Sequence, residues 1–253
     1  MKTYEEVKKK VENAIGPLKR SGKQFPERES LPSDKKELAS FLAHRIDHTL
    51  LRPESTAYEV RKLCEEAREY GFFSVCVNPF HVERCRELLE GSHSVVCTVV
   101  GFPLGQNLPE VKAYEAARLK EQGAEEFDMV LNISALRVED YQMVYRDIIQ
   151  VVEAVSPLSV KVILENCFLT DDEKVAACFS AKAAGADFVK TSTGFGKGGA
   201  TVDDVRLMRL VVGPAMAIKA AGGIKTRSDV LAMLEAGANR IGTSSGVQIV
   251  LDQ

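Results

Sequence analysis

The chain has 253 residues, of which 45% are hydrophobic and 27% are charged, and its formal net charge is −3. This composition is typical of a folded globular protein and argues against extended disorder. The chain has no excess of positive charge, so a nucleic-acid-binding protein is disfavoured. No apolar run approaches the roughly 20 residues that a membrane span needs.

The N-terminus has no apolar segment of the kind found in secretory signals, and the six cysteines form no CxxC pair. We therefore expect reduced thiols and a cytoplasmic protein. The four histidines are scattered and form no zinc motif. Neither a metal site nor another cofactor is indicated.

The first part of the chain is polar and rich in lysine. Val7, Val11 and Ile15 follow a four-residue spacing that predicts an amphipathic helix. A segment with glycine and prolines then predicts a break, and Asp34 is a candidate cap for a second helix. We expect residues 1–40 to form a helical extension, with a loose N-terminal arm as the alternative.

From residue 45 onward, short segments rich in β-forming residues alternate with longer helical stretches. The predicted strands are 45–51, 73–79, 94–103, 126–132, 159–166, 187–193, 216–223 and 240–245. The predicted helices are 55–70, 80–90, 108–122, 137–155, 171–184, 202–212 and 226–236, with a short last piece at 245–251. This alternation predicts parallel βαβ units with right-handed crossovers.

A weak internal repeat favours closure of these units into a barrel. Gly71, Gly123, Gly185 and Gly237 each join a helix end to the next strand, at spacings of 52, 62 and 52 residues. A repeat at every second unit suits a barrel in which alternate strands fill the same interior layer. The sequence thus predicts an α/β (β/α)8 TIM barrel over 41–253. A doubly wound open sheet is the alternative, although no GxGxxG follows the first strand.

Charged side chains inside apolar strands mark the place where chemistry is expected. Lys190 and Lys219 lie in consecutive strands, and Asp128 and Lys161 lie in two earlier ones. Two lysines at the same height would repel, which lowers the pKa of an amine, and only a neutral amine attacks a carbonyl carbon. The alternatives are a salt-bridged or snorkelling lysine, a surface-paired Lys161, and an Asp128 that only neutralises a lysine.

Smaller signals surround these residues. Asp47 is a candidate to bond a substrate hydroxyl, and Cys76 is either a thiol near the site or a small buried hydrophobe. Three glycine-rich turns follow the last three strands, and such turns bind anions through backbone N–H groups. They contain Gly194, then Gly222 and Gly223, then Gly242, Ser244 and Ser245. A phosphorylated substrate is predicted, with simple tight turns as the alternative.

Eight motifs in order, IDHTLL, VCVNPFHV, VVGFPLG, EFDMVLN, VKVILEN, FVKTSTGFG, KAAGGI and RIGTSSG, cover about residues 44–248. Together they resemble the deoxyribose-phosphate aldolases, a family of class I aldolases. The resemblance implies cleavage of 2-deoxy-D-ribose 5-phosphate to D-glyceraldehyde 3-phosphate and acetaldehyde in nucleoside breakdown, without a metal. It also implies small-molecule partners only and a homodimer or homotetramer.

The resemblance implies a role for each matching position. Lys190 matches the lysine that forms the Schiff base, Lys219 the second lysine that lowers its pKa and donates a proton, and Asp128 the aspartate that relays protons through water. Asp47, Thr49, Cys76 and Lys161 match residues that line the substrate pocket. Gly194, Gly222, Gly223, Lys225, Gly242, Ser244 and Ser245 match the phosphate-binding turns.

Two departures from the family pattern stand out. Ala221 replaces a more usual serine, and no tyrosine follows Tyr145, whereas some relatives end in a tyrosine that helps proton transfer. Two other functions remain as alternatives. One is another phosphosugar barrel enzyme, either a different Schiff-base aldolase or an isomerase with Glu165 as the base. The other is a sugar-phosphate-binding barrel without catalysis.

Overall fold

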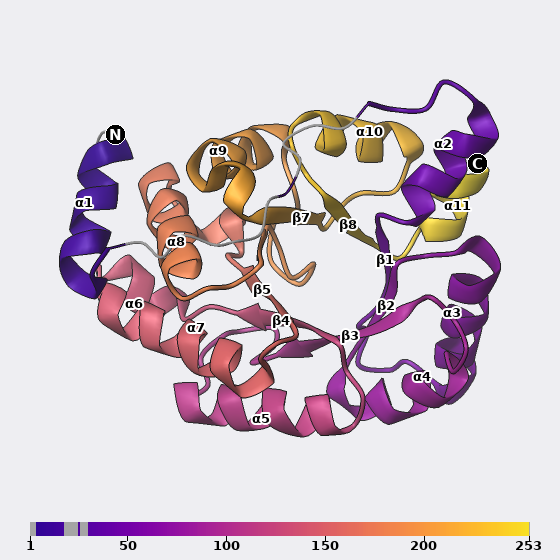
Figure 1. Cartoon of the computed structure of the whole chain (residues 1–253), viewed down its shortest axis with the longest axis horizontal. Coiled ribbons are helices and arrows are strands. Elements are labelled where there is room, and N and C mark those ends of the chain that lie inside the picture. Colours follow the sequence, from indigo (N-terminus) through magenta and orange to yellow (C-terminus); the bar gives the residue numbers. More distant parts are fainter. Residues whose placement is uncertain (1–3, 18–24, 26–29, 253) are drawn as a thin grey trace.

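The computed structural model of the chain describes residues 4–17, 25 and 30–252. Its strands are parallel and form one closed barrel in the order β1 to β8 (Figure 1). They are β1 (Ile46–Leu50), β2 (Ser74–Val77), β3 (Val95–Val100), β4 (Glu126–Val130), β5 (Ser159–Ile163), β6 (Phe188–Lys190), β7 (Ala217–Ala221) and β8 (Arg240–Thr243). All eight predicted strands are confirmed, and the open-sheet alternative is wrong.

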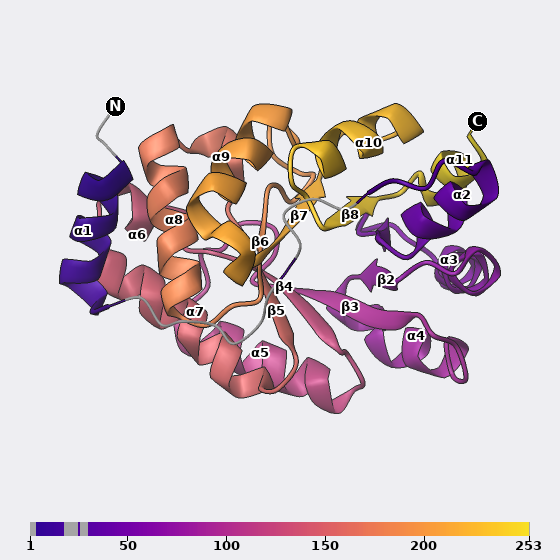
Figure 2. The same ribbon diagram turned by 45° about the horizontal axis from the view of Figure 1, so that its top comes forward.

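Helices follow the strands and surround the barrel (Figures 1 and 2). They are α3 (Ala57–Tyr70), α4 (Val82–Leu88), α5 (Pro109–Glu121), α6 (Ile133–Arg137), α7 (Tyr141–Val155), α8 (Asp171–Ala183), α9 (Val202–Val212), α10 (Arg227–Glu235) and α11 (Gly246–Leu251). Short 3-10 turns η1 (Pro79–His81), η2 (Asn166–Phe168) and η3 (Gly213–Ala215) complete the connections. The prediction differs at its 137–155 helix, because α7 begins at Tyr141, where Asp140 caps it by accepting a hydrogen bond from the Met143 N–H. The short helix α6 before it was not predicted.

The N-terminal helices α1 (Tyr4–Ile15) and α2 (Lys35–Ala43) pack on the outside of the barrel, beside α8 and α11 respectively (Figure 2). Val7 and Val11 are buried, and the Tyr4 ring meets the Phe179 ring of α8 at 5.2 Å. Asp34 caps α2 by accepting from two backbone N–H groups. Both predicted helices are therefore confirmed, and neither is part of a loose arm. Most of the predicted break between them lies outside the described residues.

The barrel register decides which side chains meet inside. The Cα of Lys190 pairs with that of Lys219 across β6 and β7, and Asp128 pairs with Lys161 across β4 and β5. Alternate residues of a strand point to the same side, so Glu126 shares the inward face with Asp128. The sequence prediction that the two lysines lie at equivalent heights is confirmed.

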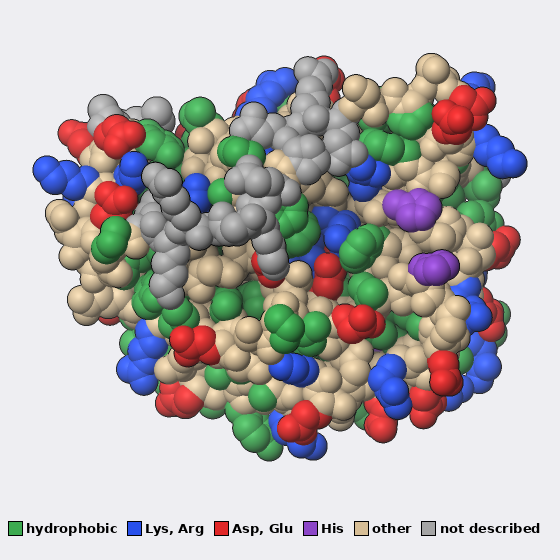
Figure 3. Space-filling model, viewed as in Figure 1, with side chains coloured by type: hydrophobic (Ala, Val, Ile, Leu, Met, Phe, Trp, Pro, Cys, Tyr) green, Lys and Arg blue, Asp and Glu red, His purple; other side chains and the backbone are tan. Residues whose placement is uncertain are grey.

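The nearly balanced numbers of acidic and basic residues are visible on the surface. Side chains of both charge signs are interspersed over the face drawn in Figure 3. Among the described residues, no helix is long and apolar enough to cross a membrane.

Candidate active site

Asp128 is the centre of the barrel interior and contacts all three lysines that the sequence singled out. Its Oδ2 lies 2.8 Å from the Nζ of Lys190 and 2.7 Å from the Nζ of Lys219. Its Oδ1 lies 2.8 Å from the Nζ of Lys161. Asp128, Lys161 and Lys219 are fully buried and Lys190 nearly so. The idea that Lys161 pairs at the surface is therefore wrong.

A second layer of charges lies against this cluster. Asp47 contacts Lys219 at 2.5 Å and Arg240 at 2.8 Å. Glu126 contacts Lys161 at 2.7 Å and Arg240 at 3.1 Å. Within the described part of the chain, the barrel interior thus holds four cations and three carboxylates in one connected network. Burial makes such groups costly unless they are paired, and here each is.

The network keeps most of its members charged. Burial opposes ionisation of Asp128, but Lys161, Lys190 and Lys219 outweigh it and hold the pKa of this carboxyl well below its usual range. Burial also opposes the charged form of Lys219, yet Asp128 and Asp47 raise its pKa above the usual value. The expectation that the two lysines depress the pKa of each other is wrong for Lys219, because its carboxylate partners prevail over repulsion.

Two thiols line the same interior. The Cys97 thiol donates to Asp128 Oδ1 at 3.2 Å and lies 3.3 Å from the Nζ of Lys161. Cys76 is fully buried with its Sγ 4.0 Å from Asp128 Oδ2. Cys76 therefore lies under the site and contacts its central carboxylate. These thiols and carboxylates lie close enough to ligate a metal ion, but ammonium and guanidinium groups already neutralise the carboxylates. We assign them to the ion-pair network.

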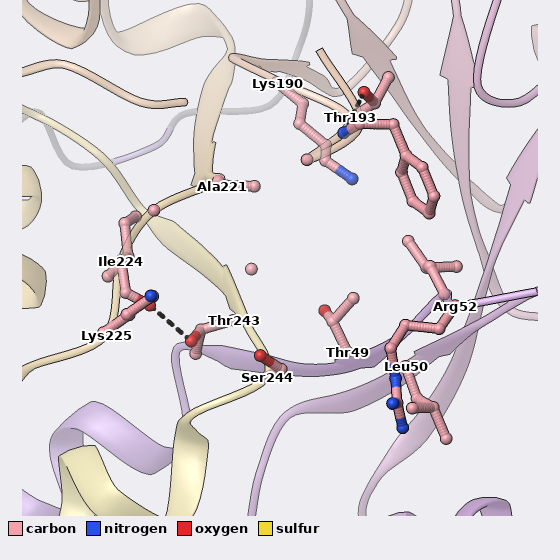
Figure 4. Close-up of a pocket in the computed structure, with 16 residues that line it drawn as sticks. Thr49, Leu50, Arg52, Lys190, Thr193, Ala221, Ile224, Lys225, Thr243 and Ser244 are labelled. Atoms are coloured by element: carbon pink, nitrogen blue, oxygen red, sulfur yellow. Dashed lines mark hydrogen bonds between the residues drawn. The ribbon is translucent and has the colours of Figure 1, made fainter. Parts of the chain in front are cut away.

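A pocket of about 270 Å³ opens above this network at the carboxyl ends of the strands. Figure 4 shows Lys190 projecting into it from one side, with Thr49 and Ser244 on the other. The Thr49 hydroxyl donates to the Asp47 carbonyl at 2.8 Å. Lys190 alone of the network's charged groups lines the pocket, so the rest of the network acts from beneath it.

Most of the predicted phosphate-binding residues line this pocket. Those lining the pocket are Gly194, Gly222, Gly223, Lys225, Gly242 and Ser244. Position 242 also requires a glycine for steric reasons, because a Cβ there would lie 2.9 Å from the Cε of Lys219. Ser245 does not line the pocket; its N–H donates to the Thr243 hydroxyl at 2.9 Å.

Glu165, the base of the isomerase alternative, is already engaged. Its carboxylate accepts from both the hydroxyl and the N–H of Thr193, and the Thr193 hydroxyl in turn accepts from the Phe195 N–H at 3.0 Å. Glu165 is buried and does not line the pocket. It shapes the β6–α9 loop, and this placement counts against an isomerase.

Three members of the network were missed in the sequence: Glu126, Arg240 and Cys97. The signal was the period of two along a strand, which places Glu126 on the face of Asp128 and Arg240 on the face of Gly242. Applied to each strand, this rule finds the second layer. Cys97 gave no comparable signal, because a buried cysteine reads as a small hydrophobe.

A parallel (β/α)8 barrel with a pocket lysine set in a buried cluster of charges defines a barrel enzyme of the lysine-dependent aldolase class. The chain belongs to the DeoC/LacD family aldolases, whose family pattern matches residues 41–252. This membership confirms the resemblance that the sequence motifs indicated.

Individual relatives agree with this assignment. The chain is 57% identical to a deoxyribose-phosphate aldolase of Caldanaerobacter subterraneus subsp. tengcongensis, over 85% of this chain and 95% of the relative. It is 58% identical to one of Thermococcus gammatolerans, over 83% and 95%. A crystal structure from Coccidioides immitis superposes with a TM-score of 0.86 at 38% identity, covering 99% of this chain and 97% of the other. The tetrameric deoxyribose phosphate aldolase of Aeropyrum pernix gives 0.80 at 33% identity, with the same coverage.

Proposed function

We propose that this protein is a metal-independent class I aldolase that reversibly cleaves 2-deoxy-D-ribose 5-phosphate to D-glyceraldehyde 3-phosphate and acetaldehyde, in the breakdown of deoxynucleosides. One observation carries the proposal. Among the network's cations, Lys190 lines the pocket and contacts a single carboxylate, whereas Lys161, Lys219 and Arg240 each contact two or more.

The charge count explains why Lys190 is the nucleophile. With all lysines protonated the described network carries four positive and three negative charges. This is one positive charge more than the carboxylates balance, and Lys190 is the cation of the network with the fewest carboxylate contacts. Neutral Lys190 is also the amine that a substrate in the pocket can reach. We assign it the Schiff-base role.

The reaction then follows from standard imine chemistry. The neutral Lys190 amine attacks C1 of the open-chain sugar, and loss of water gives the imine. Because the products contain two and three carbons, the bond that breaks is C2–C3. Its electrons move to the imine nitrogen as the C3 hydroxyl loses its proton. The resulting enamine is protonated at C2 and hydrolysed to acetaldehyde and the free amine.

Asp128 and Lys219 complete the proton path in this proposal. The low pKa of Asp128 keeps it ionised, so it passes the C3 hydroxyl proton on through water rather than storing it. Lys219, held protonated by Asp128 and Asp47, supplies a fixed positive charge that favours the neutral form of the Lys190 amine and donates a proton. The part of the site that holds the two-carbon aldehyde portion of the substrate is supported by Asp47, Thr49, Cys76 and Lys161.

The glycine-rich wall binds the 5-phosphate. Backbone N–H groups at turns and a nearby ammonium group are the usual partners of a phosphate, and Gly222, Gly223, Gly242 and Lys225 line one side of the pocket. Gly194, Ser244 and the adjacent Ser245 complete this predicted phosphate site. Binding there places C1 of the sugar toward Lys190.

Other expectations extend the proposal. We propose a cytoplasmic protein without a nucleic-acid or membrane partner, in line with its net charge of −3. We propose a homodimer or homotetramer, in line with the tetrameric Aeropyrum pernix relative. We propose that 1–40 is an extension to a catalytic barrel at 41–253, with α2 (Lys35–Ala43) lying across that boundary.

The test is product formation. The protein is incubated with 2-deoxy-D-ribose 5-phosphate in the presence of a chelator, and acetaldehyde and glyceraldehyde 3-phosphate are measured by coupled dehydrogenase assays. We expect equal amounts of both, with unphosphorylated 2-deoxy-D-ribose a poorer substrate. Folded protein that forms neither product would refute the proposed function.

A further inference from the structure

We infer that Glu126 and Arg240 are positioning residues that set the charge balance on the reactive amine from the side of the network opposite the pocket. This inference rests on the proposed role of Lys190 as the imine-forming lysine. Neither residue lines the pocket, so neither touches the substrate. They act through the side chains that they hold.

Arg240 is fixed by its surroundings. Its guanidinium lies 3.4 Å from the centroid of the Phe73 ring and 5.5 Å from that of Phe188. The same guanidinium contacts Asp47 at 2.8 Å and Glu126 at 3.1 Å, and its side chain is 8% exposed. A planar cation stacked on an aromatic ring and bonded to two carboxylates has little freedom to move.

Two chains of contacts run from this layer to the reactive amine. Through Asp47, Arg240 is joined to Lys219, which contacts Asp128. Through Lys161, Glu126 is also joined to Asp128. Both chains end on the carboxylate that contacts Lys190. A change of charge at Arg240 or Glu126 is therefore transmitted to the Lys190 amine through Asp128.

Charged and titratable groups face this amine from two directions, and Arg52 and Lys225 line the same pocket. Each of the eight strands contributes a titratable side chain to the interior: Asp47 on β1, Cys76 on β2, Cys97 on β3, Glu126 and Asp128 on β4, Lys161 on β5, Lys190 on β6, Lys219 on β7 and Arg240 on β8. The two thiols are uncharged in their protonated form. The excess of one positive charge thus depends on Glu126 and Arg240 as much as on the lysines nearer the pocket.

The two residues should consequently act in opposite directions. Glu126→Gln removes a negative charge and leaves two carboxylates for four cations, which favours proton loss from Lys190. Arg240→Gln removes a positive charge and leaves three carboxylates for three cations, which favours the protonated amine. Buried charges are poorly screened, so each change should be felt across the network.

The experiment measures imine formation as a function of pH. Each protein is incubated with acetaldehyde and cyanoborohydride, and the adduct at Lys190 is quantified by peptide mass spectrometry. We expect the pH of half-maximal trapping to fall by about half a unit in Glu126→Gln and to rise by about half a unit in Arg240→Gln. The double variant restores one excess positive charge and should return close to the wild-type midpoint.

Two controls separate a charge effect from loss of structure. Arg240→Lys keeps the charge, so its midpoint should lie nearer the wild type than that of Arg240→Gln. The KM for 2-deoxy-D-ribose 5-phosphate should stay within about twofold in the folded variants, since the pocket wall is unchanged. If Glu126→Gln does not fold, the comparison of Arg240→Lys with Arg240→Gln decides the matter in the same assay.

The outcomes distinguish this inference from the proposed function. Wild-type trapping at Lys190 with midpoints that do not move, or that move in the same direction in both single variants, would overturn the positioning role alone. Absence of any adduct at Lys190 in the wild-type protein would instead overturn the proposed function.

Discussion

The Nζ atoms of Lys190 and Lys219 contact the same carboxylate oxygen of Asp128, at 2.8 and 2.7 Å. The two lysines are Cα partners on adjacent strands, so the barrel register itself brings them to this shared oxygen. Lys219 has a second carboxylate in Asp47, whereas Lys190 faces the pocket. Lys219 is thereby held as a cation, whereas Lys190 has one carboxylate partner and is the lysine that we propose as the nucleophile.

Lys219→Leu should lower kcat by two orders of magnitude or more. The substitution removes the fixed positive charge beside Lys190 and a proton donor, and general acid–base groups contribute about 10²–10⁴-fold. The measurement is steady-state cleavage of 2-deoxy-D-ribose 5-phosphate, with the exposed Lys9→Ala in α1 as the control. Turnover near that of the wild type would remove Lys219 from the mechanism.

Asp128→Asn should abolish most activity and also destabilise the fold. The amide keeps the shape of the side chain but leaves three buried ammonium groups without their shared anion. Removing one partner of a buried ion pair typically costs about 3–5 kcal/mol of unfolding free energy. Denaturant unfolding and kcat report the two effects. A variant as stable and active as the wild type would contradict the central position of Asp128.

Lys225→Ala should raise KM for the phosphorylated substrate about tenfold and change kcat little. Lys225 is exposed and lines the pocket on the glycine-rich side, where it would contact the phosphate as a point charge. The same variant acting on unphosphorylated 2-deoxy-D-ribose provides the control, and its kcat/KM should not change. An unaltered KM for the phosphorylated sugar would argue against a phosphate at this wall.

Acid should reduce the stability that the buried ion pair of Asp47 and Lys219 contributes to the fold, and mild alkali should not. Although burial opposes ionisation, Lys219 and Arg240 hold the pKa of Asp47 below its usual value, so its contribution is complete above about pH 4 and is lost as the pH falls toward the folded-state pKa. The pKa of Lys219 is raised, so its contribution is complete below about pH 10 and is lost only at higher pH. We therefore expect no loss of stability from this pair between about pH 5 and 9.

Urea unfolding as a function of pH, compared with Asp47→Asn, checks this window. The stability difference between the two proteins should be constant from about pH 5 to 9 and should shrink below about pH 4. A difference that changes steadily through neutral pH would show that the pair titrates there and would contradict the assignment of charges.

The fold could be predicted from the sequence because its signals are local and repeated. Each strand is a short run of β-formers, and the glycines that end α3 and precede β4, β6 and β8 have positive φ, as a helix-terminal glycine requires. The short helix α6 and the true start of α7 at Tyr141 were missed, since that start depends on one cap, Asp140, within a sequence that otherwise continues a helical pattern.

The sequence analysis named the central charges of the site and Asp47, but not Glu126 and Arg240, the other two charged members of the second layer. Lys190, Lys219 and Asp128 stand out as charges inside apolar strands, and the structure brings them together. Glu126 and Arg240 lie at the first positions of β4 and β8, where a charged residue is read as the edge of a strand rather than its interior. Their contact depends on barrel closure across distant strands, which no local pattern reports.

Borohydride trapping shows whether Lys190 forms the imine. The protein is incubated with 2-deoxy-D-ribose 5-phosphate, reduced, digested and analysed by mass spectrometry, with Lys190→Ala as the control. We expect a reduced adduct on Lys190 that requires both substrate and reductant and is absent from the variant. An adduct on Lys161 or Lys219 instead, or cleavage activity retained by Lys190→Ala, would contradict it.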